Sequence, residues 1–349
     1  MTEILNSNPV NPDIGPISRA AEIIIGGGTV AFPTETVYGI GADAFNGAAC
    51  GRIFEAKGRP RDNPLIVHIS SLKQLEGVAV DVPKEISVAM NTLWPGPVTF
   101  ILKRADGIPD EVSAGLDTVA VRMPAHPIAL RLIDASKTPI AAPSANLAGK
   151  PSPTNAAHVI SDLNGRVDAI IDGGDCAFGL ESTIVDVTRR PYAMLRPGAF
   201  TIEELSGILG PIEWNGIRVL GEGERPMAPG MKYRHYAPEA RLEIVEKRLL
   251  LDLPEINMPY AVLCTDDAAG AIHRANARVV RLGSESNLYG IAKMLFDSFR
   301  KLDAMGVKLA LVQEFPERGI GLALMNRIRK ASGRETIRTR AELEAAIRL

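Results

Sequence analysis

Cysteine is scarce in this chain of 349 residues, which contains only Cys50, Cys176 and Cys264. The three are widely separated and no CxxC pair occurs, so their spacing fits neither a zinc site nor a disulfide framework. The sequence also lacks the run of about 18 apolar residues that a membrane helix needs. Its N-terminus has no basic and apolar signal region. Together these absences predict a soluble protein of the reducing cytoplasm, with no membrane partner.

The chain has no strong charge of one sign and no track of interleaved basic and aromatic residues, and its formal net charge is −2. Residues 1–206 carry six more acidic than basic side chains, so any positive charge there is local. Local positive charge suits a small phosphate ligand better than a long nucleic acid. The phosphate-binding sequence G-x-x-x-x-G-K-[ST] is missing too, so a nucleotide site in this chain must be built in another way.

Short apolar runs of strand character alternate with segments of helical spacing along the chain. The clearest strands are 29–32, 65–69, 98–103 and 118–124, and the clearest helices are 16–25 and 46–56. This alternation predicts an α/β domain over 12–206, in which helices flank a twisted mixed sheet. Residues 207–240 have no sustained period and are interpreted as a linker. The alternation resumes over 241–349 and predicts a smaller, Rossmann-like α/β domain.

Three cations, Lys57, Arg59 and Arg61, follow the predicted helix 46–56 within five residues, beside glycine, asparagine and two prolines. One interpretation is a solvated cluster that the dipole of the preceding helix favours. The other is a phosphate clamp, because guanidinium and ammonium groups match phosphoryl oxygens in charge and geometry. The residue types alone leave both interpretations open.

Two ionisable side chains lie inside otherwise apolar strands. Arg122 interrupts the run 118–124, and a buried arginine needs an anionic partner, either an internal carboxylate or the carboxylate of a ligand. His68 lies in the run 65–69, where it is either a core histidine or part of a site. Neither side chain alone shows whether it belongs to the protein core or to a ligand site.

Small polar groups and a further cation lie where other predicted strands begin or end. They are Thr34 and Thr36, Ser144 and Asn146, Ser182, and Arg196. Each is compatible with ordinary turn chemistry. Taken together they gather hydroxyl, amide and cationic groups at strand ends, where ligand sites of α/β proteins form.

Seven segments, taken in chain order, resemble the YrdC family: AFPTETVYGIGADAF, KGRPRDNPL, WPGPVTF, VAVRMPAHP, AAPSANLAG, ESTIVDV and LRPG. The linker sequence APGMKYRHYAP and the extra C-terminal domain are similar to the long, two-domain form of that family, the threonylcarbamoyl-AMP synthases. This resemblance runs through nearly the whole chain. It implies a nucleotidyltransferase that makes L-threonylcarbamoyl-adenylate and pyrophosphate from L-threonine, bicarbonate or CO2, and ATP.

The same resemblance implies which residues bind the substrates. Those for threonine are Thr34, Thr36, His68, Arg122, Ala142 and Ser182. Those for ATP are Lys57, Arg59, Asn63, Thr118, Ser144, Asn146, Ser152 and Arg196, with Arg234, His235 and Tyr236 of the linker. Lys57 and Arg59 are assigned the catalytic role, as clamps on the triphosphate, and loss of the Lys57 amine is expected to lower turnover while leaving the fold intact. Mg2+ is expected to share the charge of the leaving pyrophosphate, with no assigned protein ligand.

The resemblance also implies a downstream threonylcarbamoyl transferase complex, which modifies the adenosine beside the anticodon of tRNA. The linker is interpreted either as a lid over the ATP site or as a spacer packed between the domains. A rival hypothesis is a non-enzymatic RNA-binding or ribosome-assembly factor. The acidic balance of residues 1–206 disfavours it, and direct tRNA binding is expected to be weak at most. Carbamoyl transfer of the hydrogenase-maturation type goes with paired-cysteine zinc motifs, which this sequence lacks.

Overall fold

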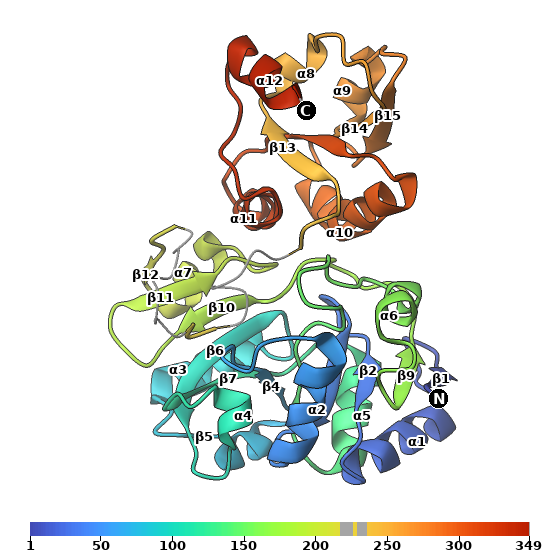
Figure 1. Cartoon of the computed structure of the whole chain (residues 1–349). Coiled ribbons are helices and arrows are strands. Elements are labelled where there is room, and N and C mark those ends of the chain that lie inside the picture. The colour runs from blue at the N-terminus through green and yellow to red at the C-terminus, as the bar shows by residue number, and fades with distance from the viewer. Residues whose placement is uncertain (217–225, 229–235, 349) are drawn as a thin grey trace. The chain divides into compact units, whose positions relative to one another are not determined.

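The computed structural model describes residues 1–216, 226–228 and 236–348. The chain divides into two compact units, which are described separately here (Figure 1). The first unit contains Met1–Ala148 and Ser152–Tyr233, and the second contains Gly149–Pro151 and Arg234–Leu349. Among the described helices, none is long and apolar enough to cross a membrane.

The described part of the first unit contains a mixed sheet of 12 strands, so the predicted twisted mixed sheet with flanking helices is confirmed. The order across the sheet is β1-β9-β2-β3-β8-β4-β7-β6-β10-β11-β12, and β5 pairs with β6. The strands are β1 Glu3–Asn6, β2 Val30–Phe32, β3 Gly39–Asp43, β4 Ile66–His68, β5 Ala79–Val80, β6 Val98–Arg104, β7 Thr118–Arg122, β8 Ile140–Ala141, β9 Ala169–Asp172, β10 Thr183–Asp186, β11 Tyr192–Arg196 and β12 Ile212–Glu213. The helices are α1 Ile14–Ile25, α2 Gly47–Lys57, the 3-10 helix Leu72–Gly77, α3 Lys84–Leu93, α4 Asp110–Ser113, α5 Pro127–Ser136, α6 Ala156–Leu163 and α7 Ile202–Leu209.

Two of these strands lie outside the predicted pattern. The edge strand β1 runs parallel to β9, and its four residues are half exposed, so its sequence carries little apolar signal. The strand β12 runs parallel to β11 and extends the sheet into the segment that the sequence assigns to the linker.

Alternate residues of the central strands belong to two different apolar clusters, one for each face of the sheet. On β4 and β7, Val67 and Val121 belong to the main core, which also contains Phe54 of α2. Their neighbours Ile66 and Ala120 belong to a second cluster, together with Ile101, Ile184 and Ala228. Because successive side chains of a strand point to opposite faces, the second cluster lies on the other face of the sheet.

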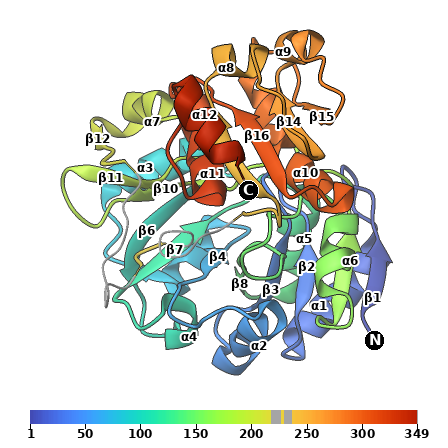
Figure 2. The same cartoon turned by 45° about the horizontal axis from the view of Figure 1, so that its top comes forward.

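We call this second face, on β4, β6, β7, β10 and β11, the polar face. Its strands lie side by side in Figure 2. Strand alternation and register place these polar side chains around the second cluster: His68, Thr99, Thr118, Arg122, Ser182 and Arg196. On the neighbouring strands β2, β8 and β9, the same face is covered by α1 and α5, whose apolar residues pack against Phe32 and Ile140.

Helix α2 leads from the sheet to a loop that carries Arg59 and Arg61, which we call the cationic loop. It begins at the predicted cap Asn46, whose side chain accepts a hydrogen bond from the backbone N–H of Ala49 at 3.0 Å. It ends at Gly58, which adopts the left-handed conformation with φ 60° that favours glycine. Lys57 is therefore the last helical residue, and the chain turns sharply directly after it.

The second unit is a smaller α/β domain of the predicted Rossmann-like type. Its strands are β13 Arg241–Val245, β14 Tyr260–Cys264, β15 Ala277–Arg281 and β16 Leu309–Gln313, all parallel, in the order β13-β16-β14-β15. Its helices are α8 Lys247–Leu251, α9 Asp266–Ala271, α10 Leu288–Met305, α11 Ile320–Ser332 and α12 Arg340–Ile347. Helices α10 and α11 cover one side of this sheet, and α8, α9 and α12 lie on the other side (Figure 1).

Candidate functional site

The loop from Thr34 to Thr36 joins β2 to β3 and is closed by its own side chains. The hydroxyl of Thr34 accepts from the backbone N–H groups of Thr36 and Val37, at 3.2 and 3.3 Å, and donates to the carbonyl of Val37 at 2.6 Å. The two threonine hydroxyls are 2.8 Å apart. All three residues of the loop are buried. The loop is therefore held in one conformation before any ligand binds.

Arg122 connects this loop to the central strands. Its Nη1 donates to the hydroxyl of Thr36 at 2.9 Å, and its Nε donates to the carbonyl of Gly96 at 3.3 Å. Its Nη2 lies 2.6 Å from Oε1 of Glu35. The residue is only 3% exposed. The internal partner that the sequence left open is thus Glu35, a residue that the sequence analysis did not select.

His68 lies beside Arg122, because the two residues are paired in the register of β4 and β7. Its Nδ1 is 3.1 Å from the carbonyl oxygen of Ile66. Burial, reinforced by the positive charge of Arg122, lowers the pKa of His68 to about 3. The ring is therefore neutral at physiological pH, so it acts as a hydrogen-bonding group and not as an imidazolium acid.

Ser182, Thr99 and Arg196 form a connected group on the polar face. The hydroxyls of Ser182 and Thr99 are 2.8 Å apart, and Arg196 donates to the carbonyl and to the hydroxyl of Ser182, each at 3.1 Å. Gly198 lets this group pack closely, since a Cβ there would lie 2.3 Å from the backbone nitrogen of Thr183. The sequence analysis missed Thr99, which is one hydroxyl within an apolar strand.

Lys57 is directed inward from the end of α2. Its Nζ donates to the backbone carbonyls of Ser144 and Asn146, at 2.5 and 2.6 Å. Burial, and then the charge of Arg59, lowers the pKa of this lysine well below its usual value. The hydroxyl of Ser144 in turn donates to Oδ1 of Asn146 at 2.5 Å. The lysine therefore fastens the turn after β8 to the end of α2.

Arg59 and Asn63 lie in the loop that follows Lys57. One Nη of Arg59 donates to the carbonyls of Asn63 and Pro64, at 3.2 and 3.3 Å. The side-chain amide of Asn63 is buried, and neither its oxygen nor its nitrogen has a hydrogen-bond partner among the described residues. Arg61, in contrast, is exposed and pairs with Glu55 at 3.1 Å. The cationic loop thus has an inner part and a solvated part.

The remaining predicted residues are distributed as follows. Thr118 begins β7 and lies on the polar face with Arg122, and the backbone N–H of Ala142 donates to the carbonyl of Ile66 at 2.8 Å. The hydroxyl of Ser152 donates to Glu181 at 2.5 Å. Tyr236 belongs to the second unit, where its ring packs at 5.1 Å from the ring of Phe296. Arg234 and His235 lie outside the described residues.

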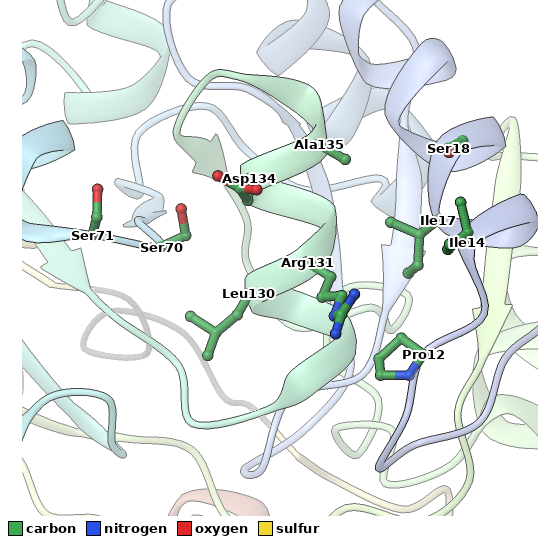
Figure 3. A pocket seen from close by; sticks show the side chains of 10 residues that line it. All are labelled: Pro12, Ile14, Ile17, Ser18, Ser70, Ser71, Leu130, Arg131, Asp134 and Ala135. Atoms are coloured by element: carbon green, nitrogen blue, oxygen red, sulfur yellow. The ribbon is translucent and has the colours of Figure 1, made fainter.

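A pocket of about 440 Å³ lies apart from all these residues (Figure 3). Arg131 and Asp134 of α5 and Ile17 of α1 line it, together with Ser70 and Ser71 after β4. No residue that the sequence assigns to threonine or ATP is among its lining. We therefore place the part of the candidate site that contains His68, Arg122 and Ser182 on the polar face and not in this pocket.

Comparisons with known proteins identify the family of the chain. A family model named for Sua5, YciO and YrdC, and described as telomere recombination, matches residues 22–198. A second model, described as the C-terminal domain of threonylcarbamoyl-AMP synthase, matches residues 200–333. The chain belongs to the Sua5/YrdC family of threonylcarbamoyl-AMP synthases.

Relatives with this name match over most of the chain. A threonylcarbamoyl-AMP synthase of Pyrococcus abyssi is 45% identical over 332 residues, which are 92% of this chain and 95% of that protein. One of Bacillus subtilis is 44% identical over 330 residues, which are 92% of this chain and 94% of that protein. The crystal structure of P. abyssi Sua5 complexed with L-threonine matches with a TM-score of 0.88 at 43% identity, covering 97% of this chain and 100% of the other.

Proposed function

We propose that this chain makes L-threonylcarbamoyl-AMP and pyrophosphate from L-threonine, bicarbonate or CO2, and ATP. The proposal rests on one observation in a chain of the threonylcarbamoyl-AMP synthase family. On its polar face, Arg122 donates a hydrogen bond to Thr36 and lies beside a neutral His68. A planar guanidinium is the side chain best suited to a carboxylate. Hydroxyls on either side of it, from Thr34, Thr36 and Ser182, suit the hydroxyl and amine of threonine.

The nucleotide is assigned to the neighbouring groups. Asn63 supports this assignment because a buried amide without hydrogen bonds is costly unless a ligand supplies partners. Arg59 and Arg196 supply positive charge, and Ser144 and Asn146 supply polar groups on a turn that Lys57 holds in place. The phosphate-contacting role given to Lys57 becomes a positioning role in this proposal, since its amine already donates to two carbonyls.

The chemistry requires orientation more than proton transfer. The ammonium of threonine first loses a proton to solvent. The resulting amine adds to CO2 and releases a second proton to give an N-carboxylate, which attacks the α-phosphorus of ATP in line while pyrophosphate leaves. Reactions of this type rest on positioning and on charges that stabilise the transition state. A neutral His68 suits such a site, because it accepts or donates a hydrogen bond without adding a charge.

Mg2+ is assigned to the substrate in this proposal. Among the described residues, no group of three or more His, Cys, Asp and Glu side chains is arranged to hold a metal ion. Mg2+ that accompanies ATP usually takes most of its ligands from phosphates and water. We assign it no protein ligand and derive no step from a protein-bound metal.

A described part of the linker supports the lid hypothesis. Ala228 is fully buried in the second cluster, together with Ile66, Ala120 and Ile184 of the polar face. Ala228 of the linker therefore lies on the face on which the substrates are proposed to bind. A cover at this place would keep water from the N-carboxylate and from the mixed anhydride of the product.

The product is an activated carbamoyl group, so a second enzyme must accept it. We propose a cytoplasmic threonylcarbamoyl transferase complex that modifies tRNA, as the family resemblance implies. The test of the proposed function is pyrophosphate release by the purified chain. Release that requires threonine and bicarbonate together would support the enzyme, and tight RNA binding without release would support the rival RNA-binding factor.

A further inference from the structure

Glu35 is a buried carboxylate with an unusual environment. It is 5% exposed, and neither of its oxygens has a hydrogen-bond partner among the described residues. Oε1 lies 2.6 Å from Nη2 of Arg122, but the angles do not meet those of a hydrogen bond, so the contact is an ion pair alone. An ion pair of this kind is often no more stable than apolar side chains of the same volume. Glu35 is the countercharge that the buried Arg122 needs, and it also brings a fixed negative charge among the residues assigned to threonine.

The other titratable groups around this pair are uncharged near pH 7.5. Burial and Arg122 lower the pKa of His68 to about 3. Burial also lowers the pKa of His126, although the charge of Glu35 opposes this shift. Burial raises the pKa of the Cys176 thiol, and Glu35 adds to that shift. The pair of Glu35 and Arg122 therefore has a net charge of zero, and the two histidines and the thiol add no charge to it. Arg196, which is also buried, lies on the same face and contacts Ser182.

We propose that the fixed charge of Glu35 makes the Arg122 site selective for acids that also carry an α-ammonium group. This inference rests on the proposed function, in which Arg122 binds the carboxylate of threonine. An acid without an amine brings a second negative charge to a single guanidinium. The threonine zwitterion brings a carboxylate and an ammonium together, so the site stays neutral.

The burial of Glu35 determines how this selectivity works. Its oxygens are enclosed by protein, so Glu35 acts through its charge in a medium of low dielectric constant, and contact with the ligand is not required. The selectivity has a use in the reaction, because only a ligand with an amino group can take up CO2, after its ammonium has lost a proton. An acid without an amine that occupied the site would block it. The negative charge of Glu35 repels such an acid, so the specificity comes from an unfavourable interaction with the wrong ligand.

The test compares two ligands that differ only in the amine. L-Threonine and (R)-3-hydroxybutyrate share the carboxylate, the hydroxyl and the methyl group, and their affinities are measured by titration calorimetry at pH 7.5 without ATP. In Glu35→Gln we expect the affinity for threonine to fall roughly 10- to 100-fold, which is the size of effect that a nearby charge exerts. The affinity for 3-hydroxybutyrate is expected to rise, because the charge of Arg122 is no longer balanced.

A matched control comes from another buried carboxylate of the same unit. Asp186 on β10 pairs with Arg189 at 3.0 Å, and it contacts none of the residues assigned to the substrates in the described structure. Asp186→Asn is expected to leave the preference between the two ligands at its wild-type value. A control that changed the preference as Glu35→Gln does would contradict a specific role of Glu35.

Two outcomes separate this inference from the proposed function. Equal loss of affinity for both ligands in Glu35→Gln would mean that Glu35 only supports the fold, and it would overturn the inference alone. Failure of the wild-type chain to bind threonine would contradict the proposed function and this inference with it. If Glu35→Gln does not fold, the wild-type chain supplies the test. Binding of 3-hydroxybutyrate within about threefold of threonine overturns the inference, and binding at least ~100-fold weaker supports it.

Discussion

Replacing Lys57 by methionine removes the ammonium group and keeps most of the volume of the side chain. The amine donates two buried hydrogen bonds, to the carbonyls of Ser144 and Asn146. Hydrogen bonds that involve a charged group contribute about 1.5–3 kcal/mol each, so the gross loss is about 3–6 kcal/mol. Part of this is offset because the variant no longer buries an ammonium, a cost that shows in the lowered pKa. We expect a net loss of about 2–4 kcal/mol in the free energy of unfolding.

That loss leaves a protein of ordinary stability folded, in line with the expectation from sequence that removal of the amine leaves the fold intact, but at a lower stability. The same change frees the turn that presents Ser144 and Asn146, and a displacement of about 1 Å in a site commonly costs about 10²-fold in rate. We therefore expect kcat/KM for ATP to fall about 10²- to 10³-fold.

The assay pairs pyrophosphate release with urea unfolding of the same preparations. The control is Lys103→Met, because Lys103 is 63% exposed and its ion pair with Asp81 lies on the surface, where such pairs contribute at most about 1 kcal/mol. Lys103→Met should match the wild-type chain in both measurements. Turnover of Lys57→Met within about threefold of wild type, or an unchanged free energy of unfolding, would refute the positioning role of Lys57.

Four further predictions follow from the same contacts. Arg122→Lys loses the bond to Thr36 and the planar fork, so kcat/KM for threonine should fall about 10²-fold in the pyrophosphate assay; an unchanged value would remove Arg122 from the threonine site. The unfolded state protonates His68 below about pH 6.5 while the folded state does not, so the free energy of unfolding falls by about 1.4 kcal/mol per pH unit down toward pH 3. Between pH 6.5 and 4.5 the free energy of unfolding of His68→Gln, measured with urea, should therefore fall by about 2–3 kcal/mol less than that of the wild-type chain. Equal falls would contradict the buried, neutral ring. Ala228→Asp places a charge in an apolar cluster, so KM for ATP should rise at least about tenfold; an unchanged KM would exclude the lid. Thr201→Ala removes the capping box of α7 and should cost about 1 kcal/mol in urea unfolding with turnover unchanged; lost turnover would tie α7 to the site.

Much of the fold was predictable, because apolar runs and helix caps mark strands and helices within short stretches of sequence. The apolar runs 65–69 and 118–124 have strand character and contain β4 and β7, and the run 98–103 covers all of β6 except its last residue, Arg104. The cap Asn46 and Gly58 mark the two ends of α2. β1 was missed because a short edge strand buries too little apolar surface to show in the sequence.

The sequence proposes members for the candidate site, but it does not indicate the contacts between them. Residue types marked Arg122 as a cation in need of a partner, but nothing in the sequence connects it to Glu35, which is 87 positions away. The partners of Lys57 are backbone carbonyls, which every residue has, so no side-chain pattern could identify them. Arg61 has the same sequence signal as Arg59, and only the direction of the chain after Gly58 separates them.

The register of the strands explains how these residues meet. Because the side chains of a strand alternate between faces, a slip of β7 by one residue would place Val121 on the polar face and Arg122 in the main core. The same slip would take Val119 and Val121 out of the main core, away from Val67 and Phe100 on the neighbouring strands β4 and β6. Each such side chain contributes about 1.5–3 kcal/mol by burial, so the two contribute about 3–6 kcal/mol. This is a large part of the whole stability of an ordinary domain, about 5–15 kcal/mol. The position of Arg122 is therefore specified mainly by apolar residues on the opposite face of the sheet.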